Sequence, residues 1–204
     1  MNKYLIIVAC ILSGSFLTAS AQTDTTLVNM KVHADLFAFD MRYATANNFL
    51  KEKVYPCDNC LVRAAVAKAL VKASEILKSS GYRIKFYDCF RPVDVQRKMW
   101  AIMPDSRYVA NPNKSGSIHN RGAAVDITLV DLNGKELDMG TAFDHFGVEA
   151  HHTYTNLSAQ VLENRKLLKR VMEQCGFVAQ PTEWWHYNYG DRSRYKISNE
   201  KLCK

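Results

Sequence analysis

Two short segments of this chain combine residue types that can bind a metal ion and activate water. One carries His119 and Asp126, and the other, further along the chain, carries Glu183 and His186. A catalytic zinc takes three protein ligands and keeps one position open for water. A carboxylate beside the ligands can accept the proton of that water. The residue types therefore predict a zinc hydrolase, in which His119, Asp126 and His186 hold one Zn²⁺ per chain and Glu183 acts as the base.

The first segment is predicted to be a loop followed by a strand. Gly122 lies between His119 and Asp126, and the β-branched residues that follow it argue against a helix. A strand over residues 123–130 would place Asp126 on one face and the apolar residues on the other, in the core. An aspartate in such a strand is costly unless it is paired or bound to metal. A buried Asp126 that accepts hydrogen bonds from backbone donors is the alternative.

The second segment is rich in aromatic residues and needs an irregular backbone. Strict alternation would put Glu183 and His186 on opposite faces of a strand. Both reach one site only if Glu183 precedes the strand or a bulge re-aims it, and Pro181 favours such a start. Because a lone histidine among aromatics is commonly a core residue, the hypothesis depends on the combination of residues. The other histidines lack a ligand pattern, and we expect surface or supporting roles for His33, His145, His151 and His152.

Arg91 is a second candidate for chemistry. It precedes Pro92, which favours an extended backbone at the end of a strand. From there its guanidinium could stabilise an oxyanion that develops on a tetrahedral intermediate. The alternative is a structural ion pair with Asp88 or Asp94.

The elements that must position these residues are helices and strands without regular alternation, and no internal repeat or long linker interrupts them. Helical spacing of apolar residues predicts helices over residues 61–80, 93–103 and 157–174. Alternation and turn signals predict strands over residues 83–89 and 123–130, a return strand over 135–139 as an option, and a last strand within residues 177–189. This order favours an α+β fold, with helices packed on an antiparallel sheet.

The N-terminus predicts export. Lys3, an apolar run over residues 4–12 and the small residues at 19–21 are typical of a signal peptide over residues 1–21. Residues 22–204 would then form a single catalytic domain that is periplasmic or secreted, with anchoring through Cys10 as a weaker alternative. The apolar run is too short to span a bilayer, and no transmembrane segment is expected in the mature chain. The net charge of +7 includes a basic tail, but export argues against nucleic acid as a partner.

The cysteines predict disulfides. Cys57 and Cys60 resemble half of a zinc ribbon, but no second Cys-x-x-Cys pair completes it. An exported protein favours disulfide chemistry instead. We expect Cys57–Cys60, or another pair from this loop, to be oxidised, and Cys89 to be a buried free thiol. Pairing of Cys175 with Cys203 is left open.

Several segments, in collinear order between about residues 28 and 190, resemble the D-alanyl-D-alanine dipeptidase family, zinc D,D-dipeptidases that include vancomycin-resistance enzymes. The matching segments are residues 40–44, 87–92, 117–126, 138–144 and 183–186. The resemblance implies a small antiparallel sheet flanked by helices, like that of hedgehog domains and D,D-carboxypeptidases. It also implies a D,D-dipeptide substrate. The roles it implies are zinc binding by His119, Asp126 and His186, base catalysis by Glu183, oxyanion stabilisation by Arg91, ammonium binding by Asp144, and a pocket-lining position for Ser117.

One departure leaves the substrate length open. Residues 148–152, after Asp144, lack an arginine that several family members carry there. The main hypothesis is hydrolysis of wall-derived D-Ala-D-Ala to two D-alanines. The alternatives are an exported D,D- or L,D-carboxypeptidase that acts on peptidoglycan stem peptides, and an inactive zinc-stabilised binding module. The presence of both Glu183 and Arg91 argues against the last, because neither is needed merely to hold a metal. The oligomeric state is left open.

Overall fold

The computed structural model describes residues 25–190, 194–198 and 200–203, so the expected signal peptide and Cys10 lie outside the described residues. Its centre is a five-stranded sheet in the order β2-β4-β5-β7-β6. All neighbouring strands in it are antiparallel except the parallel pair β2 and β4. The α+β prediction is therefore confirmed. The strands are β2 (Ala38–Phe39), β4 (Tyr82–Asp88), β5 (Ala124–Asp131), β6 (Phe177–Ala179) and β7 (His186–Tyr189).

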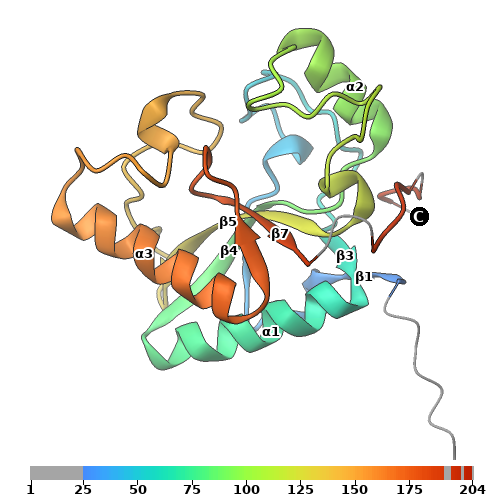
Figure 1. Ribbon diagram of the computed structural model, residues 1–204. Coiled ribbons are helices and arrows are strands. Elements are labelled where there is room, and N and C mark those ends of the chain that lie inside the picture. Colours follow the sequence, from blue (N-terminus) through green and yellow to red (C-terminus); the bar gives the residue numbers. More distant parts are fainter. Residues whose placement is uncertain (1–24, 191–193, 199, 204) are drawn as a thin grey trace, which may run out of the picture.

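Two long helices lie side by side against one face of this sheet, and the third is on the other side (Figure 1). The covering pair is α1 (Ala64–Ser79) and α3 (Ala159–Gln174), and the third is α2 (Val93–Ile102). All three agree with the predicted helices, apart from the start of α1. Leu61–Arg63 forms a short strand, β3, which pairs with β1 (Leu27–Asn29).

The core lies between the sheet and the helix pair. On β5 the side chains of Val125, Ile127 and Leu129 are fully buried in the hydrophobic core cluster. On α1 the predicted apolar stripe is buried as well, including Val66 and Leu70. Because strand residues alternate between faces, Asp126 points away from this core and towards the side of α2.

One strand prediction needs correction. Residues 135–139 form no return strand; after the turn at Gly134, the chain makes only an isolated bridge between Glu136 and Val130. The segment 177–189 holds the expected last strand, β7, and also a short strand, β6, which a turn joins to it. Pro181, which has no backbone N–H to donate, lies in that turn, and the amide of Gln180 donates to the carbonyl of His186 across it.

Short 3₁₀ helices complete the fold: η1 (Met30–His33), η2 (Arg42–Ala44), η3 (His119–Arg121) and η4 (Val148–Ala150). Within the described ranges, none of the helices has the length and apolar character needed to cross a bilayer.

The disulfides differ from the predicted pairing. Cys57 is bonded to Cys203 and Cys60 to Cys89, while the buried Cys175 is free. The loop cysteines are oxidised as expected, but the prediction of a free Cys89 is wrong. The amide of Phe90 donates to the carbonyl of Leu61, and this contact brings the end of β4 beside Cys60.

Candidate metal centre

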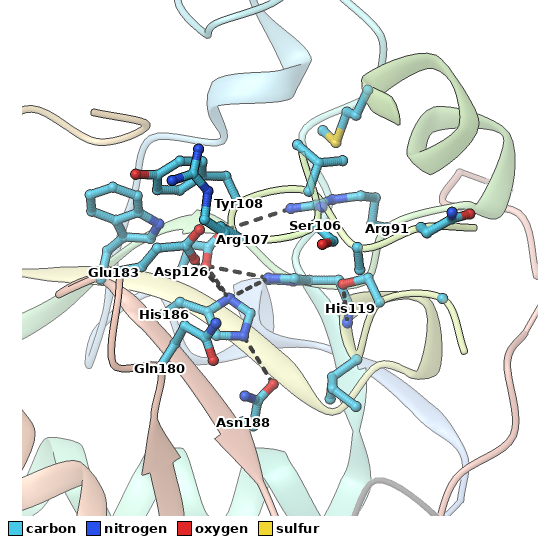
Figure 2. A pocket seen from close by; sticks show the side chains of 18 of the residues that line it. Arg91, Ser106, Arg107, Tyr108, His119, Asp126, Gln180, Glu183, His186 and Asn188 are labelled. Carbon is cyan, nitrogen blue, oxygen red and sulfur yellow. Dashed lines mark hydrogen bonds and ion pairs between the residues drawn. The ribbon is translucent and has the colours of Figure 1, made fainter. Parts of the chain in front are cut away.

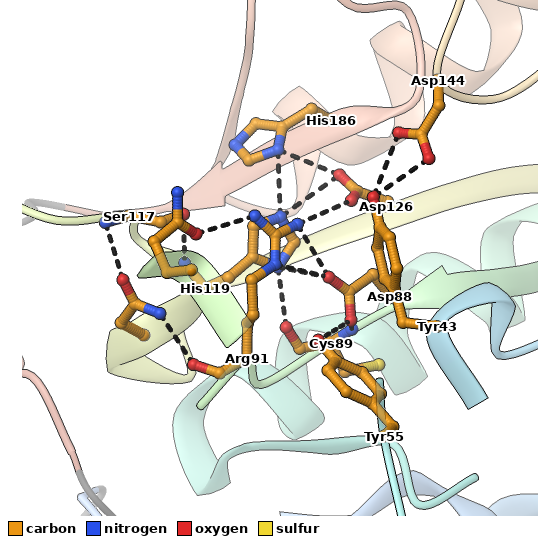
Figure 3. Close-up of polar contacts among 12 residues, drawn as sticks. Tyr43, Tyr55, Asp88, Cys89, Arg91, Ser117, His119, Asp126, Asp144 and His186 are labelled. Atoms are coloured by element: carbon orange, nitrogen blue, oxygen red, sulfur yellow. Dashed lines mark hydrogen bonds and ion pairs between the residues drawn. The ribbon is translucent and has the colours of Figure 1, made fainter. Parts of the chain in front are cut away.

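Three side chains from separate parts of the sequence converge on one point (Figures 2 and 3). Nδ1 of His186 lies 2.9 Å from Oδ1 of Asp126 and 3.1 Å from Nε2 of His119. The same His119 nitrogen is 3.3 Å from Oδ1 of Asp126. Two imidazole nitrogens and a carboxylate oxygen at such spacing form a donor set that suits zinc. The residues present therefore fit the metal that the sequence predicts.

The backbone explains this convergence. Asp126 on β5 and His186 on β7 are directly paired residues in the antiparallel register. His119 lies in η3, and Gly122 then adopts φ +69°, a left-handed conformation that glycine tolerates, to turn the chain into β5. The predicted loop, turn and strand are thus confirmed.

Hydrogen bonds orient both rings. Nδ1 of His119 lies 2.7 Å from the backbone carbonyl oxygen of Cys89. A carbonyl only accepts, so Nδ1 carries the proton and Nε2 keeps its lone pair for a metal. On His186, Nε2 lies 2.9 Å from Oδ1 of Asn188. Although burial opposes ionisation of Asp126, the adjacent His119 and His186 hold the pKa of its carboxyl well below the usual range.

Glu183 lies in the turn before β7. It therefore precedes the strand that carries His186, which is one of the two backbone arrangements that allow both side chains to reach one site. Its side chain is buried, and a carboxylate oxygen lies 3.8 Å from Nδ1 of His186. Burial raises the pKa of Glu183 to about 8 in the metal-free protein. A cation held by the nearby ligand atoms would lower that pKa, because it stabilises the carboxylate.

Arg91 is held rigidly beside the three ligands. Its Nε and Nη2 donate to the same oxygen of Asp88 at 3.0 and 2.8 Å, and Nη1 donates to Gln96 at 2.9 Å. Nη2 is also 3.7 Å from Oδ2 of Asp126. Burial lowers the pKa of Arg91, but the charge of Asp88, together with Tyr43, Tyr55 and Asp126, outweighs it, and the net shift is well upward. The ion pair considered for Arg91 therefore exists with Asp88, whereas Asp94 pairs with Arg97.

Asp144 and Ser117 line the same cleft as the three ligands. Asp144 adopts φ +61°, a strained conformation for a residue other than glycine, and the hydroxyl of Tyr43 donates to its carboxylate at 3.0 Å. Desolvation, followed by the nearby charge of Asp126, raises the pKa of Asp144 to about 8. The hydroxyl oxygen of Ser117 accepts from the backbone amide of His119, which stabilises the loop.

The cleft has a volume of about 640 Å³. Its lining also includes the aromatic rings of Phe49, Tyr108 and Phe146; Phe146 packs edge to face on Phe49 and tilted on Tyr108. The histidines expected to play other roles stay out of the metal cluster; His145, for instance, contacts Glu149.

Several residues of the site were not found by sequence reasoning. They are Tyr43, which holds Asp144; Tyr55, which donates to Asp88; Gln96, which contacts Arg91; and Asn188, which contacts His186. Asn188 alone had a usable signal, because two residues after His186 on a strand share its face. The others come from distant segments that only the fold brings together.

Comparison with known proteins gives consistent matches. A family model described as D-ala-D-ala dipeptidase matches residues 23–202. The D-alanyl-D-alanine dipeptidase of Escherichia coli (strain K12) is 34% identical, over 86% of this chain and 91% of its own. The D-alanyl-D-alanine dipeptidase of Enterococcus faecium is 32% identical, over 73% of this chain and 84% of its own. A solved structure of VanYB in complex with D-Alanine-D-Alanine covers 72% of this chain and 78% of its own at 14% identity, and its TM-score of 0.44 is too low to carry an argument.

Proposed function

The chain belongs to the D-Ala-D-Ala dipeptidase family, and from this premise we propose that it hydrolyses D-Ala-D-Ala to two D-alanines in cell-wall metabolism. The observation that carries the proposal is the convergence of His119, Asp126 and His186 in one cleft with Glu183 and Arg91. A site that merely held a metal would need neither of the last two residues.

The chain's own residues supply most of the chemistry. Zn²⁺ held by the three ligands would polarise the scissile carbonyl and acidify the attacking water. Glu183 accepts the proton of that water and passes it to the leaving amine. Arg91, whose guanidinium is fixed by Asp88 and Gln96, stabilises the oxyanion of the tetrahedral intermediate.

The remaining cleft residues fit the ends of a small substrate. The carboxylate of Asp144 is the group that would bind the free ammonium of a dipeptide, because opposite charges attract strongly where water is excluded. Tyr43 supports this role by holding that carboxylate in place. Ser117 lines the pocket on the side of His119.

A second candidate substrate follows from the size of the cleft. A volume of about 640 Å³ lies within the range of pockets that take drug-sized ligands, and it exceeds what a dipeptide of two alanines fills. This favours, as the second candidate, a D,D- or L,D-carboxypeptidase that cleaves the end of a peptidoglycan stem peptide by the same chemistry.

In either case residues 1–21 are proposed to direct the catalytic domain, residues 22–204, to the periplasm or the exterior.

The test is release of D-alanine by the purified protein from D-Ala-D-Ala and, separately, from a pentapeptide stem ending in D-Ala-D-Ala. We expect release from the dipeptide, its loss after chelation and its recovery with Zn²⁺, with L-Ala-L-Ala as the control. Cleavage of the pentapeptide alone would replace the first candidate by the second. Failure to cleave either peptide with zinc bound would leave only a binding module.

A further inference from the structure

We propose that Asn188 is a positioning residue, which fixes the ring of His186 in the tautomer that presents Nδ1 to the metal. The inference rests on the proposed zinc centre. It assigns a role to a residue of the cleft that is not one of the three ligands but acts through one of them.

The two nitrogens of His186 have different surroundings (Figure 2). Nδ1 faces Asp126 at 2.9 Å and His119 at 3.1 Å, so it is the nitrogen that can bind the metal. Nε2 points the other way and lies 2.9 Å from Oδ1 of Asn188. A neutral imidazole has one protonated nitrogen and one with a free lone pair. Metal binding through Nδ1 therefore requires the proton on Nε2, and the Nε2–H then donates a hydrogen bond to Oδ1 of Asn188.

Without Asn188 the opposite tautomer would have the advantage. Because the carboxylate of Asp126 lies 2.9 Å from Nδ1, a proton on Nδ1 would make a charge-assisted hydrogen bond to it. That tautomer cannot bind a metal through Nδ1. An acceptor on the far side of the ring offsets this preference, and Asn188 is the partner that Nε2 has.

The strand holds this acceptor in place. Asn188 and His186 are alternate residues of β7, so they share one face. The backbone of Asn188 is in register with Ala124 on β5 and with Val178 on β6, so strands flank it on both sides. The second ring is oriented differently: Nδ1 of His119 meets the backbone carbonyl of Cys89, which no side-chain substitution removes. Of the two ring-orienting contacts, the one from Asn188 can be tested by mutation.

The experiment compares Asn188→Leu, which removes the acceptor at similar size, with Asn188→Asp, which can only accept. Zinc affinity is measured by competition with a chromophoric chelator. Exchange of the Nε2 proton of His186 with solvent is followed by NMR in the zinc-loaded protein. Ligand-orienting partners typically contribute about 10–100-fold to metal affinity. We expect Asn188→Leu to lose zinc affinity by that factor and to exchange the proton faster, and Asn188→Asp to bind as tightly as the parent or more tightly.

The control is Val178→Leu, which adds the same side chain at the paired position on β6 and should leave both readouts unchanged. Parent-like zinc affinity in Asn188→Leu would overturn the proposal while leaving the zinc centre intact. Should Asn188→Leu fail to fold, a tenfold loss of affinity in a folded Asn188→Asp would overturn it equally. Failure of the zinc centre is separately visible, because the parent itself would then bind no zinc, and failure of the proposed hydrolysis is visible in the D-alanine release assay, which neither readout here depends on.

Discussion

Asp126 and His186 face each other as a directly paired couple on β5 and β7, with 2.9 Å between Oδ1 and Nδ1. Two candidate ligands on paired strands are fixed by the ladder of backbone hydrogen bonds rather than by loop conformation. His119, which comes from η3, is the ligand outside that ladder. The sheet thus positions two of the three donor residues, Asp126 and His186, and the loop supplies the third, His119.

Zinc binding is expected to depend on the loop ligand as well. His119→Ala leaves Asp126 and His186 in place but only two protein ligands, which hold zinc poorly. We expect the parent to contain one equivalent of zinc by metal analysis, and His119→Ala to lose it on dialysis. His145→Ala, which alters a histidine outside the cluster, is the matched control. Stoichiometric zinc in His119→Ala would contradict the assignment.

Glu183 is expected to be needed for turnover but not for metal binding. Its carboxylate lies beside the ligand set, 3.8 Å from Nδ1 of His186, rather than within it. Glu183→Gln should keep zinc and fold while losing activity by about 10²–10⁴-fold, the usual contribution of one positioned acid–base group. Hydrolysis of D-Ala-D-Ala at near the parental rate by this variant would show that another group is the base.

Arg91 is expected to contribute to both activity and stability, because the fully buried Asp88 is its ion-pair partner. Arg91→Met leaves that carboxylate unpaired, and removing one partner of a buried pair costs about 3–5 kcal/mol in the free energy of unfolding. Adding Asp88→Asn removes the charge but keeps an acceptor for the hydroxyl of Tyr55.

The double variant should therefore regain part of the stability lost by Arg91→Met, measured by urea unfolding, and none of the activity. Recovery of activity in the double variant would show that Arg91 acts only as a structural partner of Asp88. Lack of any stability change in Arg91→Met would contradict the importance of the ion pair.

The Cys57–Cys203 disulfide is expected to stabilise both the fold and the metal loop. It tethers the C-terminal segment, in which Leu202 is buried and the amide of Ser198 donates to the carbonyl of Asn120, the neighbour of His119. Replacing both cysteines by serine should lower the free energy of unfolding by about 2–4 kcal/mol and weaken zinc binding. Cys175→Ala, at the free thiol, is the control. Unchanged unfolding and zinc affinity in the double serine variant would contradict this role.

His152 is expected to make stability fall in mild acid. Burial, and then the charge of Lys169, lowers its pKa to about 4, whereas the unfolded chain has the ordinary value of about 6.5. Between these values the unfolded state binds more protons, so stability rises with pH. The contribution is full above about pH 6.5 and is lost as the pH falls towards about 4. Urea unfolding across that window should show a shallower pH dependence for His152→Gln, and equal slopes would refute the prediction.

Local pattern was enough to predict much of this protein. The alternation around Asp126 gave the strand and the face on which the carboxylate lies, and Pro181 indicated the irregular start of the strand that carries His186. These features depend on neighbours within a few residues, and backbone periodicity makes them visible in sequence. The combination of ligand types with Glu183 likewise predicted the chemistry, because metals and proton transfers require particular functional groups.

The partners of those residues depended on the tertiary structure. Cys89 bonds to Cys60 rather than remaining free, Arg91 is held by Asp88 and Gln96, and Asp126 is paired with His186. Sequence alternation shows which side of a strand a residue faces, but strand register and the approach of distant segments fix what lies opposite it. The sequence by itself therefore indicated the candidate ligands, base and arginine of the site, and only the fold decided which partners hold them, because pairing depends on contacts between segments far apart in the chain.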